Sequence, residues 1–238
     1  MSISQIKTIS ISDFRTHSGA IYPQIKLHYQ EFGKQIGKAP VVLVNHALTA
    51  NSLVAGEYGW WNQVIGKNKT IDTNNFTIIA FNIPGNGYDG LLIDNYKDFV
   101  AKDIANMFLL ALKKMSICKL HAIIGGSLGG GIAWEMAVLN PVIATHIIPI
   151  AADWRSTDWL IANCCIQEQF LLNSSNPVHD ARMHAMMCYR TPVSYKAKFN
   201  RSIHEELKIF NIESWLFHHG KKLQKRFQLS AYKMMNHL

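Results

Sequence analysis

A serine flanked by glycines is the side chain in this sequence best suited to covalent chemistry. Residues 125–129 read GGSLG, with a glycine two positions before and two positions after Ser127. A hydroxyl in this pattern is typical of a nucleophile that attacks a carbonyl carbon and carries the acyl group as an ester. The glycines are expected because a Cβ beside such a strained turn would collide with neighbouring strands. We predict Ser127 as a catalytic nucleophile; the alternative is a turn serine that caps the following helix.

The segments on either side of this motif have the order that such a nucleophile requires. Residues 120–124 form a short apolar run that predicts a strand, and residues 128–139 predict a helix that stops at Asn140 and Pro141. A strand, a sharp turn and a helix would expose the serine above a sheet. The helix would also direct its free N–H groups, and the positive end of its dipole, toward the serine oxygen.

An attacking serine needs amide donors that stabilise the negative charge on the carbonyl oxygen. Residues 45–49 read NHALT and directly follow an apolar run at 41–44. In such enzymes the loop after an earlier strand supplies the second donor. We therefore predict that the backbone N–H groups of Leu48 and Leu128 form an oxyanion hole. His46 lies in the same loop, and we interpret it as a structural residue that holds the loop, in preference to an acid or base.

Apolar runs alternate with helical segments along the N-terminal part of the chain. Further runs at 76–81 and 144–151 resemble the two described above, and residues 96–114 have the pattern of an amphipathic helix. Continuous apolar runs are typical of parallel strands that are covered on both faces. This alternation predicts an α/β fold with a mostly parallel sheet. The alternating stretch 24–33 is expected to form an antiparallel hairpin arm at the sheet edge.

The C-terminal part of the chain has a different pattern. Helices are expected at 159–172, 178–188, 194–199 and 212–235, with no convincing strand among them. We therefore predict a core at residues 1–152 and a helical lid at residues 153–238.

The composition excludes several classes of protein. Of the 238 residues, 48% are apolar and 17% are charged, which excludes a wholly disordered chain. No apolar run reaches the roughly 18 residues of a membrane helix, and residues 1–25 show no signal peptide, so we expect a cytoplasmic protein. The net charge of +8 comes from scattered Lys and Arg, and we expect neither a nucleic-acid nor a membrane partner.

The sequence also lacks the patterns of a held metal or cofactor. No His, Asp or Glu cluster has metal-ligand spacing, and the glycines around the serine do not have dinucleotide-binding spacing. The cysteines show no metal-binding spacing either, and we expect them to be buried, reduced thiols. They are Cys118, Cys164, Cys165 and Cys188.

Several separated motifs between residue 40 and the end of the chain resemble those of one enzyme family. They are HALT at 46–49, GGSLGG at 125–130, WLIAN at 159–163, ARM at 181–183, YRT at 189–191 and FNIESW at 210–215. Together they resemble the homoserine O-acetyltransferase family of the α/β-hydrolase fold. Two positions depart from the family pattern: Leu128 stands where methionine is usual, and the glycine-rich loop at 84–90 is shorter.

The resemblance implies an α/β-hydrolase fold with a helical lid and a two-step acyl transfer. Ser127 would take an acetyl group from acetyl-CoA, a co-substrate, and pass it to the hydroxyl of homoserine for methionine biosynthesis. The sequence leaves open a succinyl donor and a serine acceptor. The resemblance also implies a homodimer formed through the lid helices.

The resemblance further implies that Arg182 and Tyr189 bind substrate. An arginine fork is a natural partner for the carboxylate of an amino acid. Seven residues apart on a helix, the two side chains are expected on one face, two turns apart. The alternatives are a salt bridge for Arg182 and a packed aromatic ring for Tyr189.

A serine nucleophile also needs a histidine base and an orienting carboxylate, which in this fold follow it on loops after later strands. No strand-like run follows residue 151. We therefore expect this chain to correspond to the N-terminal two thirds of the acyltransferase, without its final strands and its catalytic Asp and His. Asp153 follows the last strand, but we interpret it as a helix cap. The histidines of the predicted lid are poor candidates for the base.

Two other functions stay open. A serine hydrolase, such as an esterase or thioesterase, would share the fold and the serine but use water as acceptor. A non-catalytic binding module is the third possibility. Without further strands, an open sheet edge at 147–151 would expose unpaired backbone groups. We therefore expect either that something covers this edge or that the isolated chain is aggregation-prone and only partly folded.

Overall fold

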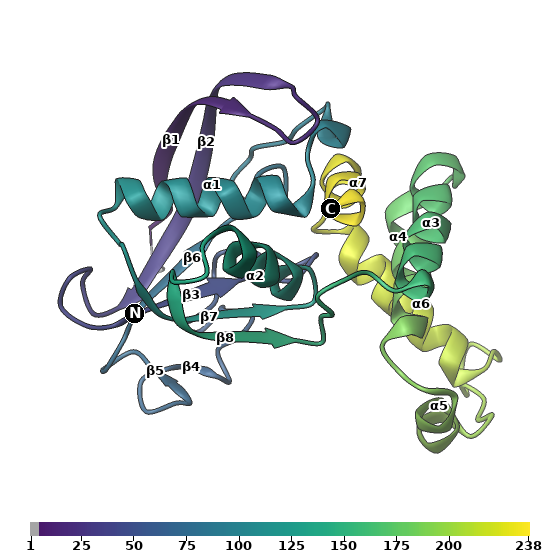
Figure 1. Cartoon of the computed structure of the whole chain (residues 1–238). Coiled ribbons are helices and arrows are strands. Elements are labelled where there is room, and N and C mark those ends of the chain that lie inside the picture. The colour runs from purple at the N-terminus through teal and green to yellow at the C-terminus, as the bar shows by residue number, and fades with distance from the viewer. Residues whose placement is uncertain (1–4) are drawn as a thin grey trace. The chain divides into compact units, whose positions relative to one another are not determined.

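The computed structural model describes residues 5–238, which fold into two compact units (Figure 1). Unit 1 contains residues 5–156 together with 237–238, and unit 2 contains residues 157–236. The division after residue 156 lies close to the boundary after residue 152 that the sequence suggested.

Unit 1 is built on a six-stranded sheet with the strand order β1-β2-β6-β3-β7-β8 (Figure 1). The strands are β1 (Lys7–Arg15), β2 (Ile21–Gly33), β3 (Val41–Asn45), β6 (Thr77–Phe81), β7 (Leu120–Gly126) and β8 (Ala144–Ile150). Strands β6, β3, β7 and β8 pair in parallel, whereas β2 runs antiparallel to both of its neighbours. The mostly parallel sheet predicted from the apolar runs is therefore present.

The two outer strands agree with the sequence-based expectation only in part. The hairpin arm around residues 24–33 is present as β2, but β1 pairs along its outer side and is itself the edge strand. At the other side, β8 pairs only with β7 among residues 5–238, so the open edge expected at 147–151 is present. Its side chains His146, Ile148 and Ile150 are exposed. The prediction that residues 144–151 are covered on both faces is wrong. An apolar run predicts a strand, but it does not show what packs on the two faces of that strand.

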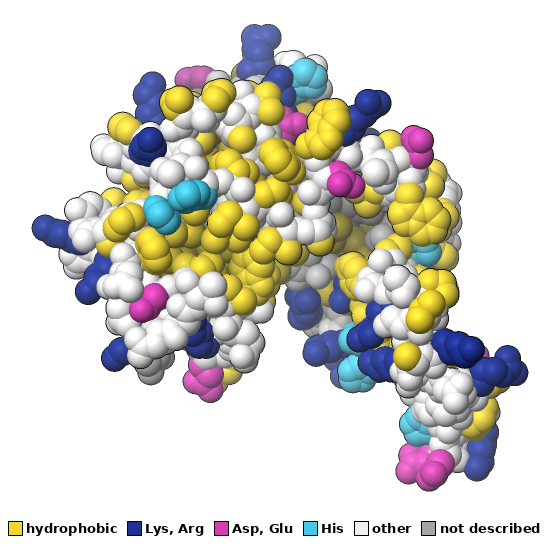
Figure 2. Space-filling view, turned by 60° about the horizontal axis from the view of Figure 1, so that its bottom comes forward, with side chains coloured by type: hydrophobic (Ala, Val, Ile, Leu, Met, Phe, Trp, Pro, Cys, Tyr) yellow, Lys and Arg dark blue, Asp and Glu magenta, His cyan; other side chains and the backbone are white. Residues whose placement is uncertain are grey.

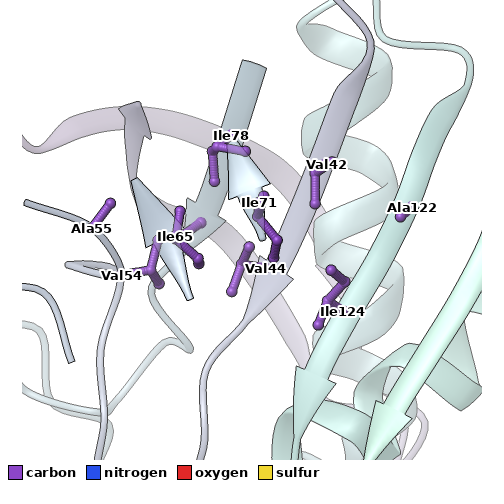
Figure 3. Packing of buried hydrophobic residues seen from close by; sticks show 10 residues of the cluster. Val42, Val44, Val54, Ala55, Ile65, Ile71, Ile78, Ala122 and Ile124 are labelled. Carbon is purple, nitrogen blue, oxygen red and sulfur yellow. The ribbon is translucent and has the colours of Figure 1, made fainter. Parts of the chain in front are cut away.

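One face of the sheet packs on an aliphatic cluster (Figure 3). Its members are Val42, Val44, Val54, Ala55, Ile65, Ile71, Ile78, Ala80, Ala122 and Ile124. Alternate residues of β3 and β7 reach this face, as the two-residue period of a strand requires. The isoleucines at 65 and 71 come from a small parallel ladder of β4 (Ile65–Gly66) and β5 (Ile71–Asp72). Strands this short carry no periodic signal, and the sequence did not predict them.

Two helices, α1 (Ala101–Lys114) and α2 (Leu128–Leu139), pack against the opposite face of the sheet (Figure 1). The helix expected at 96–114 is divided, because a 3₁₀ turn, η1 (Tyr96–Asp98), precedes α1. The Asp103 carboxylate accepts the Val100 N–H at 2.9 Å and the His17 N–H at 2.7 Å. These bonds fix the start of α1 after the turn.

Unit 2 is helical. It contains α3 (Asp158–Asn173), α4 (Pro177–Cys188), α5 (Pro192–Phe199), α6 (Asn211–Gln224) and most of α7 (Leu229–His237). The single helix expected at 212–235 is two helices, because the chain bends at 225–228 and buries Phe227 with its ring 5.8 Å from that of Tyr232. None of the helices in the described chain has the length and apolar character needed to cross a membrane.

The cysteines are reduced, but their predicted burial is wrong. Cys118, Cys165 and Cys188 are exposed, and Cys164 is half-buried. Burial raises the pKa of the Cys164 thiol.

Candidate active site

Ser127 joins β7 to α2 in a strained backbone conformation. Its φ is 52° and its ψ is −121°. A residue with a side chain rarely adopts a positive φ, and holding it there costs on the order of 1–3 kcal/mol. Ser127 occupies the N-cap position of α2, but its side chain makes no cap hydrogen bond, so the alternative of a helix-capping serine is wrong. The residue is exposed, which leaves its hydroxyl accessible to a reactant.

The glycines of the motif allow the strand and the helix to approach closely. A Cβ on Gly125 would lie 2.1 Å from the carbonyl oxygen of Gly129, and a Cβ on Gly129 would lie 2.3 Å from that of Asn45. A Cβ on Gly130 would meet the Cβ of Ala152 at 2.5 Å. Carbon atoms do not approach backbone oxygens this closely, so any side chain at Gly125 or Gly129 would displace the turn.

Neighbouring strands hold the turn on both sides. Asn45, at the end of β3, is paired in register with Gly125 and is fully buried. Its side-chain amide donates to the Gly129 carbonyl at 3.3 Å. On the other side, the Ser127 N–H donates to the Ile150 carbonyl of β8 at 2.9 Å. Ser127 is therefore fixed at the carboxyl edge of the parallel strands, where this class of sheet places its sites.

The loop after β3 leaves the sheet at this same edge, because β3 and β7 are parallel neighbours. A turn closed by the Ala50 N–H and the Ala47 carbonyl, 3.0 Å apart, contains Leu48. Within residues 5–238, neither the Leu48 N–H nor the Leu128 N–H donates to another backbone group. Both amides are thus free of backbone partners, as an oxyanion hole requires, and the role itself stays a prediction.

His46 is a structural side chain, which confirms the interpretation made from the sequence. Its Nε2 accepts the Ile83 N–H at 2.9 Å, so its Nδ1 carries the proton and donates to the Ala47 carbonyl at 2.8 Å. Burial lowers the pKa of His46 to about 4. The neutral imidazole therefore joins the loop after β3 to the loop after β6, and neither nitrogen is left for proton transfer.

A histidine–aspartate pair that the sequence did not indicate lies at the same edge of the sheet. His28 Nδ1 is 2.8 Å from Asp89 Oδ2, and the Asn82 amide donates to the same oxygen at 2.9 Å. However, β2 carries His28 and is separated from β7 by β6 and β3. Three strand spacings place it about 14 Å from the strand that ends at Ser127. The pair ties β2 to the loop after β6 and is too far away to activate the serine.

In unit 2, Arg182 and Tyr189 contact each other at the end of α4. The guanidinium donates to the Tyr189 hydroxyl at 3.3 Å and lies 5.4 Å from the centre of its ring. The prediction that the two share a face is confirmed. Tyr189 is 61% exposed, so the packed-ring alternative is wrong. Within the described residues of unit 2, Arg182 has no carboxylate partner, and the alternative of a salt bridge from the lid to the core stays a prediction.

Comparison with known proteins identifies the family. Residues 40–159 match the model of the alpha/beta hydrolase fold. Over 92% of this chain, the homoserine O-acetyltransferase of Trichormus variabilis is 30% identical and the homoserine O-succinyltransferase of Nitrosomonas europaea is 32% identical. The chain belongs to the homoserine O-acyltransferase family. It spans 68% and 69% of the lengths of these two relatives.

Solved structures show that this family member has the α/β-hydrolase fold. The homoserine O-acetyltransferase of Staphylococcus aureus superposes with a TM-score of 0.82 at 24% identity, over 98% of this chain and 71% of the other. Esterase E22 also superposes with a TM-score of 0.82, at 20% identity, over 98% of this chain and 77% of the other. At these identities the likeness establishes the fold alone. The fold and family expected from the motifs are both confirmed.

Within the described residues of this acyltransferase family member, no hydrogen bond joins the Ser127 hydroxyl to a histidine. The rings of His121 and His146 meet edge-on, with their centres 5.2 Å apart. They lie near the start of β7, about 20 Å along this strand from Ser127. Asp153 is exposed and caps no helix, because Thr157 caps α3 through the Leu160 N–H at 3.2 Å. The capping interpretation of Asp153 is therefore wrong.

Proposed function

We propose that this protein transfers an acetyl group from acetyl-CoA to the side-chain hydroxyl of homoserine through an ester on Ser127. The observation that carries the proposal is the strained, uncapped Ser127 at the sheet edge where the loop after β3 also leaves, in a chain about 30% identical to homoserine O-acyltransferases. The Leu48 and Leu128 amides, which lack backbone partners, support it. The named relatives include both acetyl- and succinyltransferases, so the test includes both acyl donors.

In the first step, Ser127 Oγ attacks the thioester carbonyl and forms a tetrahedral oxyanion. The N–H groups of Leu48 and Leu128 donate to this oxyanion. The C–S bond then breaks, CoA leaves with the serine proton, and the acyl group remains on Ser127 as an ester. In the second step the homoserine hydroxyl attacks that ester, its proton returns to Ser127, and the acylated product leaves. Moving the proton in both steps requires a general base, and no histidine among the described residues is hydrogen-bonded to the Ser127 hydroxyl to fill that role.

Arg182 is proposed to bind the carboxylate of homoserine. Its guanidinium is held by the Tyr189 hydroxyl and is not neutralised by a carboxylate among the described residues. A free guanidinium offers a planar pair of N–H donors that matches a carboxylate. Tyr189 positions the guanidinium and presents its own exposed ring to the substrate.

The decisive experiment measures CoA release and acylated product from the full chain, with acetyl-CoA or succinyl-CoA, in the presence and absence of homoserine. Transfer predicts CoA release that depends on homoserine and matches the O-acylhomoserine formed. CoA release that ignores homoserine would instead show a serine hydrolase. A fluorophosphonate probe should label the wild-type protein and fail to label Ser127→Ala. Absence of wild-type labelling together with absence of turnover would favour a binding module.

A further inference from the structure

The turn that contains Leu48 is held at both of its ends by buried side chains. Leu48 is the first central residue of the turn that the Ala50 N–H and the Ala47 carbonyl close at 3.0 Å. The first central N–H of such a turn takes no part in the closing hydrogen bond, and its direction follows the plane of the turn. The direction of the Leu48 N–H therefore depends on what fixes Ala47 and Ala50.

Both ends of this turn are tied to the loop after β6. At the first end, His46 Nδ1 donates to the Ala47 carbonyl at 2.8 Å, and its Nε2 accepts the Ile83 N–H at 2.9 Å. At the other end, the side-chain amide of Asn86 donates to the Ala50 carbonyl at 2.8 Å. His46 is fully buried, and Asn86 is 2% exposed. The loop after β6 thus supports the whole turn.

The Asn86 amide is itself fixed in one orientation. Its Oδ1 accepts the Tyr88 N–H at 3.1 Å, so its Nδ2 faces the Ala50 carbonyl. The glycines on either side, Gly85 and Gly87, have φ values of 83° and 79°. Glycine adopts such values without strain, which lets the backbone fold tightly around Asn86. The loop after β6 therefore holds this donor in a defined place.

The burial of Asn86 separates its role from that of Leu48. An oxyanion donor is effective only when its N–H points at the position that the charged oxygen takes. Leu48 is half-buried, so its N–H belongs to a residue that solvent and reactants can reach, whereas Asn86 is buried behind the turn. Loss of the Asn86 amide would remove a buried hydrogen bond from the Ala50 carbonyl and loosen that end of the turn.

We propose that Asn86 is a positioning residue that fixes the direction of the Leu48 N–H by binding the Ala50 carbonyl. It acts through the Leu48 N–H on the oxyanion of the transition state and makes no contact with either substrate. The inference rests on the proposed function, which gives the Leu48 N–H its role. It predicts that loss of the Asn86 amide slows the chemical step and leaves substrate affinity unchanged.

The same substitution at two buried asparagines tests the proposal. Asn86→Ser keeps an oxygen that can accept the Tyr88 N–H but is too short to donate to the Ala50 carbonyl. Asn82→Ser is the matched control, because Asn82 is 1% exposed and its amide donates to Asp89 at 2.9 Å, not to the loop after β3. Asn86→Leu keeps the side-chain volume and provides a second test if Asn86→Ser unfolds. Thermal melts check that each variant is folded.

The fluorophosphonate probe measures the chemical step without a second substrate, because its phosphoryl oxygen takes the place of the oxyanion. The rate of Ser127 labelling as a function of probe concentration gives the probe affinity and the rate constant separately. Removing an oxyanion donor outright costs about 10²–10³ in rate, so displacing one should lower the rate constant of Asn86→Ser about tenfold, with unchanged probe affinity. Asn82→Ser should be labelled like wild type. Acyl transfer by Asn86→Ser should show a lower kcat and unchanged KM values.

The outcomes separate this inference from the proposed function. A wild-type rate constant in folded Asn86→Ser, or an equal loss in Asn82→Ser, would overturn the inference even if the protein transfers acyl groups. Labelling of wild type with the loss confined to Asn86→Ser, in a protein that transfers no acyl group to homoserine, would support the inference and contradict the proposed function. A wild-type protein that is neither labelled nor active would overturn both, because no oxyanion hole would then operate.

Discussion

Asn45 and Gly129 lock the nucleophile turn to the neighbouring strand. The Asn45 side chain donates to the Gly129 carbonyl at 3.3 Å, and the Asn45 carbonyl lies 2.3 Å from the position a Cβ on Gly129 would take. The residues that precede the predicted oxyanion loop therefore pack directly on the first turn of α2. This contact couples the position of Ser127 to the position of that loop.

Gly129→Ala should therefore destabilise the protein. The added methyl group must displace the Asn45 backbone, and overpacking of this kind costs about 1–3 kcal/mol. Gly131→Ala is the matched control in the same helix, because a Cβ there meets nothing within 4 Å. It should be neutral or stabilise the helix by up to about 1 kcal/mol. Urea denaturation of both variants measures the difference, and equal stabilities would contradict the packing described for Gly129.

The positive φ of Ser127 gives a second prediction. Ser127→Gly and Ser127→Ala both remove the hydroxyl, but only glycine adopts a φ of 52° without strain. Ser127→Gly should be more stable than Ser127→Ala by on the order of 1 kcal/mol. Thermal melts monitored by circular dichroism test this order. If alanine proves the more stable, the turn is not strained at this residue.

Much of this site could be predicted from the sequence, because its signals are local. The spacing of the glycines around Ser127 predicted the turn, and the apolar runs before Asn45 and Ser127 predicted the strands that carry the two loops. The contacts of His28 with the Asp89 side chain and of Asn45 with the Gly129 carbonyl could not be predicted, because the partners are far apart in the sequence. Such contacts depend on strand order and register, which composition and periodicity do not specify.

The errors have the same physical origin. Residues 144–151 were expected to be covered on both faces, and the cysteines were expected to be buried. In both cases residue type was used as a guide to burial, but burial depends on which neighbours the fold supplies. Phe227 is a further example, since its burial bends the chain where a continuous helix was expected.

Arg182 should control the affinity for homoserine. Arg182→Lys keeps the positive charge but loses the planar donor pair, so the KM for homoserine should rise about tenfold, with little change in the KM for acyl-CoA. Arg201→Lys is a control, because its guanidinium lies 5.6 Å from the centre of the Phe210 ring and no substrate contact is proposed for it. Steady-state kinetics with each substrate varied test this prediction. An equal rise in both KM values would show that Arg182 has no selective contact with homoserine.

The buried His46 should make stability depend on pH. Its pKa is about 4 in the folded protein and about 6.5 when unfolded, so between these values the unfolded state binds more protons. The contribution of neutral His46 to the free energy of unfolding is fully present above about pH 6.5. This contribution is lost as the pH falls toward 4, and the total loss is about 3 kcal/mol. Urea denaturation at several pH values should show this slope. His46→Gln should lower stability at pH 7 and flatten the slope; an equally steep slope in this variant would assign the effect to other groups.

The outer edge of β8 should promote self-association. Among the described residues this strand pairs only with β7, and Ile148 on it is 42% exposed. Figure 2 shows a broad hydrophobic area on unit 1. An unpaired apolar edge strand is a template for pairing with another chain, and a lysine on it blocks such pairing. Ile148→Lys should therefore remain monomeric at concentrations where the wild-type protein associates.

Val138→Lys is the control, because Val138 is 75% exposed but lies on α2, away from the strand edge. Sedimentation velocity over a concentration series tests the pair. Equal association by the two variants would place the contact elsewhere, and a wild-type protein that stays monomeric throughout would show that this edge does not pair.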